Sequence, residues 1–120
     1  MFDADHDRIH VTSTSVVYPT GNGGSDAALA NSLFKTSACG TAVIAGVVVT
    51  SNSAGLTLTI YGIDGTTVLQ TLVLAANVLG SFSLFDMRCP KMTSGAVTNG
   101  GFGVKVSAGA ATVFFRQNQG

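Results

Sequence analysis

Residues 56–74 read LTLTIYGIDGTTVLQTLVL, and this stretch predicts a β-hairpin. Leu56, Leu58 and Ile60 alternate with threonine, which is the period of a strand that buries one face. Asp64-Gly65 follows, and glycine at the second position supplies the positive φ that a tight hairpin turn requires. The stretch therefore predicts two antiparallel strands joined at Asp64-Gly65.

The register of this hairpin stays open in the sequence. A two-residue loop would pair Ile60 with Leu69, whereas a three-residue loop would pair Ile60 with Val68. The two registers place the returning strand on opposite faces. Because both faces of that strand carry apolar residues, the pattern does not choose between them.

Outward from the hairpin, short apolar runs are separated by Gly, Asn and Asp. The candidate strands are 9–18, 41–51, 56–62, 66–75, 79–86, 102–107 and 111–117, with a weaker eighth at 32–37. Residues 25–30 could form one helical turn, and no longer helical period is present. The pattern predicts an all-β chain, a single antiparallel β-sandwich or jelly-roll of about seven to eight strands. We expect residues 1–10 to form an N-terminal arm and residues 11–120 the β-sandwich domain.

Three further segments carry specific expectations. Residues 102–107 and 111–116, joined at Ala108-Gly109, predict a second hairpin in which Phe102, Val104 and Val106 share one face. Residues 41–51 are apolar on both faces, so this strand is either central in its sheet or packed against another subunit. Residues 20–25 and 93–101 are rich in glycine and asparagine and predict exposed loops.

Charge is scarce in this sequence. Six acidic and six basic residues among 120 give a formal net charge of zero, and charged residues make up 10% of the chain, against about 25% in a typical soluble domain. This balance argues against non-specific nucleic-acid binding, which needs a basic footprint. A weakly charged surface favours association, so we expect much of the surface to be covered by a partner or by further copies.

The sequence indicates neither a membrane protein nor an enzyme. No apolar run is long enough to span a bilayer, and the acidic N-terminus is unlike a signal peptide, so we expect synthesis in a reducing compartment. No nucleophile elbow or phosphate loop occurs, and outside residues 1–10 the only acids are Asp26, Asp64 and Asp86. We expect no catalysis and no cofactor. Cys39 and Cys89 are expected to be buried free thiols, with a disulfide as the alternative.

The first ten residues differ from the rest because they hold three of the six acidic residues and both histidines. Asp3-x-Asp5-x-Asp7 resembles the start of a calcium loop but lacks its glycine and its distal glutamate, and His6 and His10 give only a weak transition-metal signal. We expect no metal here and instead a solvated or partner-ordered tail. The predicted partner-binding residues are Phe2, Asp3, Asp5, His6, Asp7, Arg8 and His10.

The aromatic residues fit core packing, since most phenylalanines lie on or beside predicted strands. Phe114 and Phe115 are adjacent and cannot both face one side of a strand. We expect one of them in the core and the other at an interface.

Two parts of the sequence carry a resemblance to a known family: the 56–74 hairpin, and Cys89-Pro90 followed by GFGVKVSAGAATVFFR at 101–116. They resemble small virion proteins of tailed phages that decorate the capsid, called cement proteins, over about residues 56–116. The resemblance implies a β-sandwich or jelly-roll on the capsid surface of the virion, made in the bacterial cytoplasm. It further implies a homotrimer bound to the major capsid protein, with an N-terminal arm that contacts the shell or its neighbours, and no catalytic residues.

Two other functions remain open from the sequence. A carbohydrate- or receptor-binding module of a phage fibre would place Tyr18, Tyr61 and the glycine-rich loops at a ligand groove. A portal or tail adaptor would be purely structural, and only its position in the particle would separate it from a decoration protein.

Overall fold

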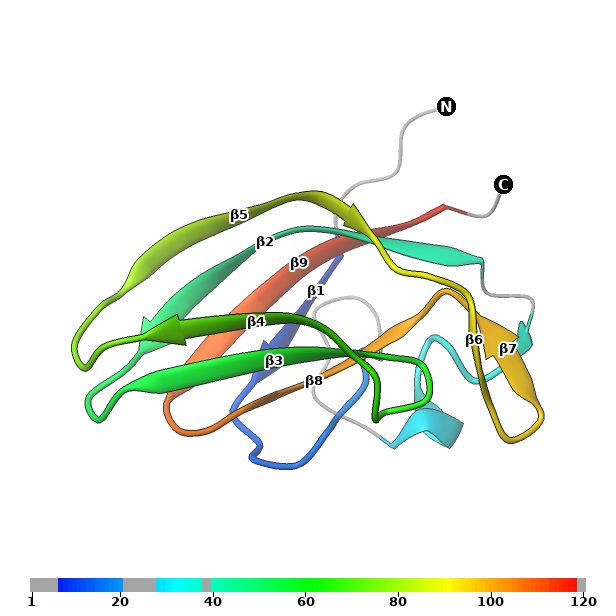
Figure 1. Cartoon of the computed structure of the whole chain (residues 1–120), viewed down its shortest axis with the longest axis horizontal. Helices are drawn as coiled ribbons and strands as arrows, with labels where there is room; N and C mark the ends of the chain where they lie inside the picture. The colour runs from blue at the N-terminus through cyan, green and yellow to red at the C-terminus, as the bar shows by residue number, and fades with distance from the viewer. Residues whose placement is uncertain (1–6, 21–27, 38–39, 119–120) are drawn as a thin grey trace.

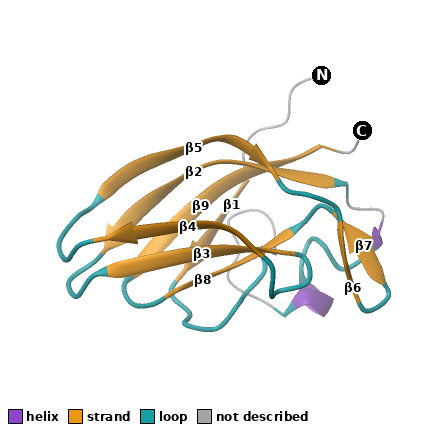
Figure 2. Cartoon of the chain, in the orientation of Figure 1, coloured by secondary structure: helices purple, strands orange, loops and turns teal. Residues whose placement is uncertain are grey.

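The computed structural model describes residues 7–20, 28–37 and 40–118 of the chain (Figure 1). Its strands are β1 (Asp7–Val11), β2 (Thr41–Ser51), β3 (Leu56–Gly62), β4 (Val68–Leu74), β5 (Gly80–Arg88), β6 (Met92–Ser94), β7 (Val97–Asn99), β8 (Phe102–Val106) and β9 (Ala110–Asn118). A short 3-10 helix, η1 (Leu29–Asn31), lies at one end of the molecule (Figure 2). The prediction of an all-β fold is confirmed.

The strands form two antiparallel layers (Figure 1). One sheet has the order β1-β9-β2-β5, the other has the order β4-β3-β8, and β6 pairs with β7 in a separate ribbon. The inner faces of both layers meet in one core, to which the four-stranded sheet contributes Ile44 and Val113 and the three-stranded sheet Leu58 and Val104. The chain is therefore an antiparallel β-sandwich.

Three phenylalanine rings occupy one part of this core. The Phe102 ring centroid lies 5.0 Å from that of Phe115 and 5.7 Å from that of Phe34, and all three side chains are fully buried. Phe34 comes from the segment 32–37, which is built of turns, so the strand predicted there is wrong. This segment is apolar because its Phe34 side chain fills part of the core, and not because it forms a strand.

The two-faced pattern of 41–51 is explained by a β-bulge in β2. The register with both neighbouring strands shifts between Ile44 and Gly46. Ala42 and Ile44 are buried before the shift, and Val47 and Val49 are buried after it, so the extra residue reverses which positions face the core. β2 lies between β9 and β5, which confirms the central position among the two alternatives.

Neither register considered for the first hairpin holds along its whole length, because this hairpin also contains a bulge; the two-residue-loop register is found only next to the turn. Tyr61 pairs with Val68, but after a shift at Ile60 and Tyr61 the pairs become Ile60 with Gln70 and Leu56 with Leu74. The loop holds four residues, since the Gly62 amide donates to the Thr67 carbonyl at 3.0 Å. The expected positive φ is found at Gly65, at +73°.

The second predicted hairpin is also wrong. β8 pairs with β3 in one sheet, whereas β9 pairs with β1 and β2 in the other. Ser107 stays with β3, because its amide donates to the Thr57 carbonyl at 2.9 Å, and Gly109 at φ +76° then turns the chain across to the other layer. The expected common face of Phe102, Val104 and Val106 is confirmed, since all three are fully buried.

Two other segments differ from expectation. Residues 93–101 include the β6–β7 ribbon and not only a loop, and the Asn99 amide nitrogen is buried where it donates to the carbonyls of Phe34 (3.0 Å) and Thr36 (2.9 Å). The strand predicted over 9–18 ends at Val11, and the chain then runs along β8, where Val17 and Val104 exchange two 2.9 Å hydrogen bonds. Of the helical turn expected at 25–30, only the part from Ala28 is described, and it leads into η1.

The hairpin loop yields a pH prediction through Asp64. Its carboxylate accepts hydrogen bonds from the amides of Thr66 (3.1 Å) and Thr67 (3.0 Å) and from the Thr67 hydroxyl (2.6 Å). These bonds, chiefly the two from Thr67, lower the pKa of Asp64 from 3.8 to about 2. A carboxyl group whose pKa is lower in the folded state stabilises the fold at pH values above its unfolded-state pKa. This contribution is lost as the pH falls towards the folded-state pKa.

We therefore expect Asp64→Ala to lower the free energy of unfolding by about 1 kcal/mol at neutral pH and to have a shrinking effect as pH falls from 3.8 towards 2. Urea unfolding followed by circular dichroism across that range measures the difference. Asp64→Asn is the matched control, because its amide oxygen can still accept the hydrogen bonds of the Thr66 and Thr67 amides but the side chain no longer titrates. A constant difference between wild type and Asp64→Ala at all pH values would contradict the role of the ionised carboxylate.

Candidate interaction surfaces

Three arginines from distant parts of the sequence meet on the outer face of the four-stranded sheet. In the observed register, Val43 of β2 pairs with Arg116 of β9 on one side and with Arg88 of β5 on the other. Arg8 of β1 pairs with Phe114 of β9 in a neighbouring row of the same face. We call this surface the arginine face and define it by Arg8, His10, Val43, Val48, Arg88, Phe114 and Arg116.

The predicted partner-binding residues that are described lie in β1. Arg8 and His10 are exposed on the arginine face, and His10 Nδ1 lies 3.0 Å from the Thr112 hydroxyl. Asp7 pairs with Phe115 at the start of the strand, and its carboxylate accepts a hydrogen bond from the Arg8 amide at 2.8 Å. These residues of the expected arm are thus part of the sheet, whereas Phe2, Asp3, Asp5 and His6 lie outside the described residues.

A shallow groove of about 380 Å³ lies beside the arginines, between β2 and β5. Gly46 belongs to its lining, and a Cβ added there would lie 2.7 Å from the Phe82 carbonyl oxygen, so the close approach of the two strands requires glycine. Phe114 borders the groove and is half-buried, while Phe115 is fully buried in the core. The prediction that one of the two rings is core is confirmed.

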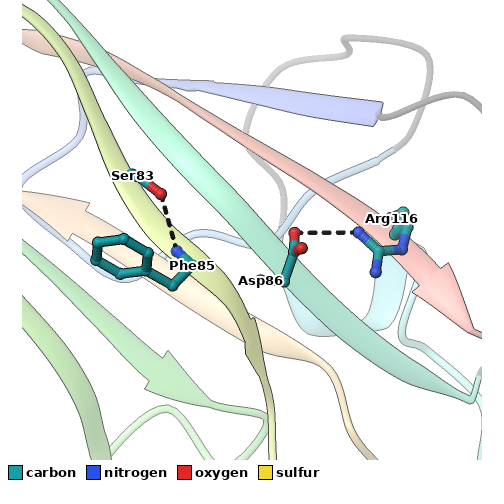
Figure 3. Close-up of polar contacts among 4 residues, drawn as sticks. All are labelled: Ser83, Phe85, Asp86 and Arg116. Carbon is teal, nitrogen blue, oxygen red and sulfur yellow. Dashed lines mark hydrogen bonds and ion pairs between the residues drawn. The ribbon is translucent and has the colours of Figure 1, made fainter.

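β5 carries an exposed phenylalanine in an unfavourable backbone conformation (Figure 3). Phe85 is 87% exposed, and Phe85 and Asp86 have φ of +56° and +54°. Left-handed backbone is uncommon for residues other than glycine and is an outlier for a bulky side chain. Strain of this kind persists only where the surroundings hold it, and it gathers at functional sites.

Two polar contacts hold this segment in place. The Ser83 hydroxyl accepts a hydrogen bond from the Phe85 amide at 3.0 Å, and Asp86 reaches across β2 to Arg116 at 3.2 Å (Figure 3). The ion pair is exposed and contributes little to stability. Its effect is to fix Asp86 over β2, while Phe85 points away from β2 on the other side of its strand.

A second groove, of about 410 Å³, lies on the outer face of the three-stranded sheet. Thr57, Thr59, Tyr61 and Lys105 are among its lining residues, and the Lys105 ammonium lies 5.7 Å from the Tyr61 ring centroid. Tyr18 does not line it. The Tyr18 ring is buried and its hydroxyl donates to the Ile63 carbonyl at 3.3 Å, and burial is the main reason that its pKa is raised.

Among the described residues, one further group with possible reactivity is the buried thiol of Cys89. Cys89 is free and 1% exposed, and burial raises its pKa to about 12, so it stays protonated at neutral pH. Cys39 lies outside the described residues. Within the described ranges, no three His, Cys, Asp or Glu residues gather as metal ligands, and no helix has the length and apolar character needed to cross a membrane.

The strain at Phe85 yields a stability prediction. Phe85→Gly should relieve about 1–2 kcal/mol of backbone strain, offset by about 0.5–1 kcal/mol of extra unfolded-state entropy. We expect the free energy of unfolding to stay constant or rise by up to about 1.5 kcal/mol, because an 87% exposed ring loses little packing. Urea unfolding measures this change. Leu84→Gly is the control, since Leu84 is half-buried without a positive φ and should be clearly destabilised. A loss of stability in Phe85→Gly comparable to that control would contradict the strain.

Comparison with known proteins finds no relative of this chain. No protein-family model, curated protein or solved structure matches the chain. What the chain does is therefore inferred from its own residues and geometry.

Proposed function

We propose that this chain is a structural protein without catalytic activity that binds a larger protein assembly in many copies through its arginine face. Joined with the resemblance of residues 56–116, this makes it a capsid decoration protein of a tailed phage, bound to the major capsid protein on the virion surface. The observation that carries the proposal is the gathering of Arg8, Arg88 and Arg116 on one sheet face of a chain with so few charges.

The charge on this face identifies the chemistry of the partner. Three of the six Lys and Arg residues lie on the arginine face, and among the acids that the structure describes, Asp86 reaches over it and is held by Arg116. The face is therefore positive although the chain is neutral. Complementary charge steers association and fixes orientation, so the surface fits an acidic patch on a protein shell.

Apolar contacts would supply the affinity for the shell, whereas the arginines would steer the approach of the two surfaces. The groove at Gly46 and the half-buried Phe114 ring lie in the row next to Arg88 and Arg116, and Arg8 pairs with Phe114 at one end of that row. An apolar centre with a polar rim is the usual anatomy of a protein interface. Burial of such a centre at many sites would resist separation of the shell subunits, since each copy contributes its own contact.

Charge reversal tests this proposal. Arg8→Glu combined with Arg88→Glu should weaken binding to purified capsids of the encoding phage at least about tenfold, because both exposed side chains would then repel an acidic patch. Cosedimentation of capsids with added protein at low and high salt measures the binding.

The matched control is Lys35→Glu combined with Lys91→Glu, which makes the same charge change at two exposed residues outside the arginine face. Equal loss of binding in both double variants would show a general charge effect and would reject the arginine face as the contact. Absence of binding by the wild-type chain would reject the decoration role itself.

The N-terminal residues allow a separate prediction. Deletion of residues 2–6 leaves all of β1 in place, and β1 supplies the pairs of Ile9 with Val113 and Val11 with Ala111. We expect this deletion to preserve the thermal unfolding midpoint and to weaken capsid binding, because the resemblance implies an N-terminal arm that contacts the shell, and Phe2, Asp3, Asp5 and His6 belong to that arm. Calorimetry and capsid cosedimentation give the two measurements. Unchanged capsid occupancy would remove these four residues from the contact.

A carbohydrate-binding module is the second candidate, favoured by one observation: the groove that contains Tyr61 and Lys105. An aromatic ring beside polar hydroxyls and a cation suits sugar recognition. Binding to a glycan array that is lost in Tyr61→Ala and kept in the double arginine variant would favour this function. Electron microscopy of the particle separates a capsid position from a portal or tail position.

A further inference from the structure

The large exposed apolar side chains of the described residues lie on one side of the sandwich. They are Val68, Val73, Val78, Leu79 and Phe85, all between the start of β4 and the middle of β5. β4 and β5 are the outer strands of their sheets on this side, away from β1 and β8 (Figure 1). We call this surface, defined by those five residues, the open side.

Three of the four outer strands of the two layers carry features that discourage pairing with another chain. β8 is covered by the segment 13–17, whose Ser13 carbonyl accepts from Val106 at 3.0 Å and whose Val17 pairs with Val104. β1 carries Asp7, Arg8 and His10 among its five residues. β5 is interrupted by the irregular Phe85 and Asp86. Charges, bulges and covering segments are the usual protections of sheet edges.

β4 carries no charge and, among the described residues, no covering segment, and its bulge lies near its start at Leu69, so residues 70–74 form a regular edge. Its seven residues, VLQTLVL, contain no charge, proline or glycine, and in the described structure it pairs with β3 alone. Val73 is 71% exposed and Val68 is 54% exposed, so the strand presents apolar side chains together with an unpaired row of backbone groups. A strand of this kind is a template for pairing with another strand.

We propose that β4 pairs with β4 of a second copy of this chain, antiparallel and about a two-fold axis. This joins the two three-stranded sheets into one and brings side chains of the partner strand beside Val68 and Val73 on the outer face of the joined sheet. The inference adds a self-contact to the proposed assembly role and uses a surface other than the arginine face.

The charge distribution favours a second copy as the occupant. No charged residue occurs between Gly65 and Phe85, so two copies can meet there without bringing like charges together. The formal net charge of zero adds no overall repulsion between copies. A two-fold axis matches each β4 edge with the same uncharged edge, which is the usual closed symmetry of homo-oligomers. Val78 and Leu79, in the turn that follows β4, extend the apolar surface beyond the strand.

Sedimentation equilibrium of the full chain over a wide concentration range tests this pairing. We expect wild type to form a dimer and Val73→Lys to dimerise at least about tenfold more weakly, because pairing would place the lysine ammonium among the uncharged side chains of the partner strand. Val68→Lys is the second variant and should act in the same direction. Both side chains are more than half exposed in the single chain, so thermal unfolding should be little changed.

Thr12→Lys is the matched control, since Thr12 is exposed and lies beyond β1 on the opposite side of the sandwich. Hydrogen exchange adds a local readout: amides of β4 should become protected as wild-type concentration rises, and amides of β5 should not. A wild type that stays monomeric, a trimer without a dimer, or equal weakening by Thr12→Lys would each overturn the inference.

The outcomes also separate this inference from the decoration role. A monomer that still binds capsids would overturn the β4 pairing and leave the decoration role standing. A dimer that does not bind capsids would do the opposite. If Val73→Lys removed capsid binding from a monomeric wild type, the occupant of β4 would be a shell strand, and the self-contact would be rejected.

Discussion

The β-bulge in the middle of β2 is the constraint on which both faces of the four-stranded sheet depend. One extra residue at Ala45 lets Ile44 and Val47 both point into the core, although they are three positions apart. The same shift leaves Val43 on the outer face between Arg88 and Arg116, where it is still only 3% exposed. Long arginine stems can cover such an apolar residue while their charged ends stay in water.

The bulge also accounts for the irregular part of β5. Ile44 pairs with Met87 and Gly46 pairs with Ser83, so three residues of β5 stand opposite the single residue Ala45. The excess is absorbed by the left-handed backbone of Phe85 and Asp86. The exposed ring and the ion pair with Arg116 therefore follow from the same defect that gives the groove its close approach at Gly46.

Alternation and turn chemistry were sufficient to predict the all-β class, the first hairpin and the buried face of Phe102, Val104 and Val106. They could not predict register, because a bulge changes the partner of every later residue without a signal of its own, as at Ile60 and Tyr61. Ala108-Gly109 was assigned to a hairpin because a connection between layers needs the same turn residues as a connection within one sheet. The arginine face was missed for a related reason: Arg8, Arg88 and Arg116 become neighbours only through the pairing of four strands.

The scarcity of charge has a different meaning once its placement is known. A formal net charge of zero does not indicate the charge of a partner. The structure, however, places three arginines on one face, and β4 carries no charge. A charged face and an uncharged edge suit different partners, since steering by complementary charge favours a dissimilar surface, whereas an uncharged edge can meet its own copy without repulsion. β4 lies at the edge of one sheet and the arginine face lies on the outside of the other. Two contacts at separate places would let one copy bind a shell and a neighbour at the same time, and linked contacts raise the overall affinity beyond that of either one.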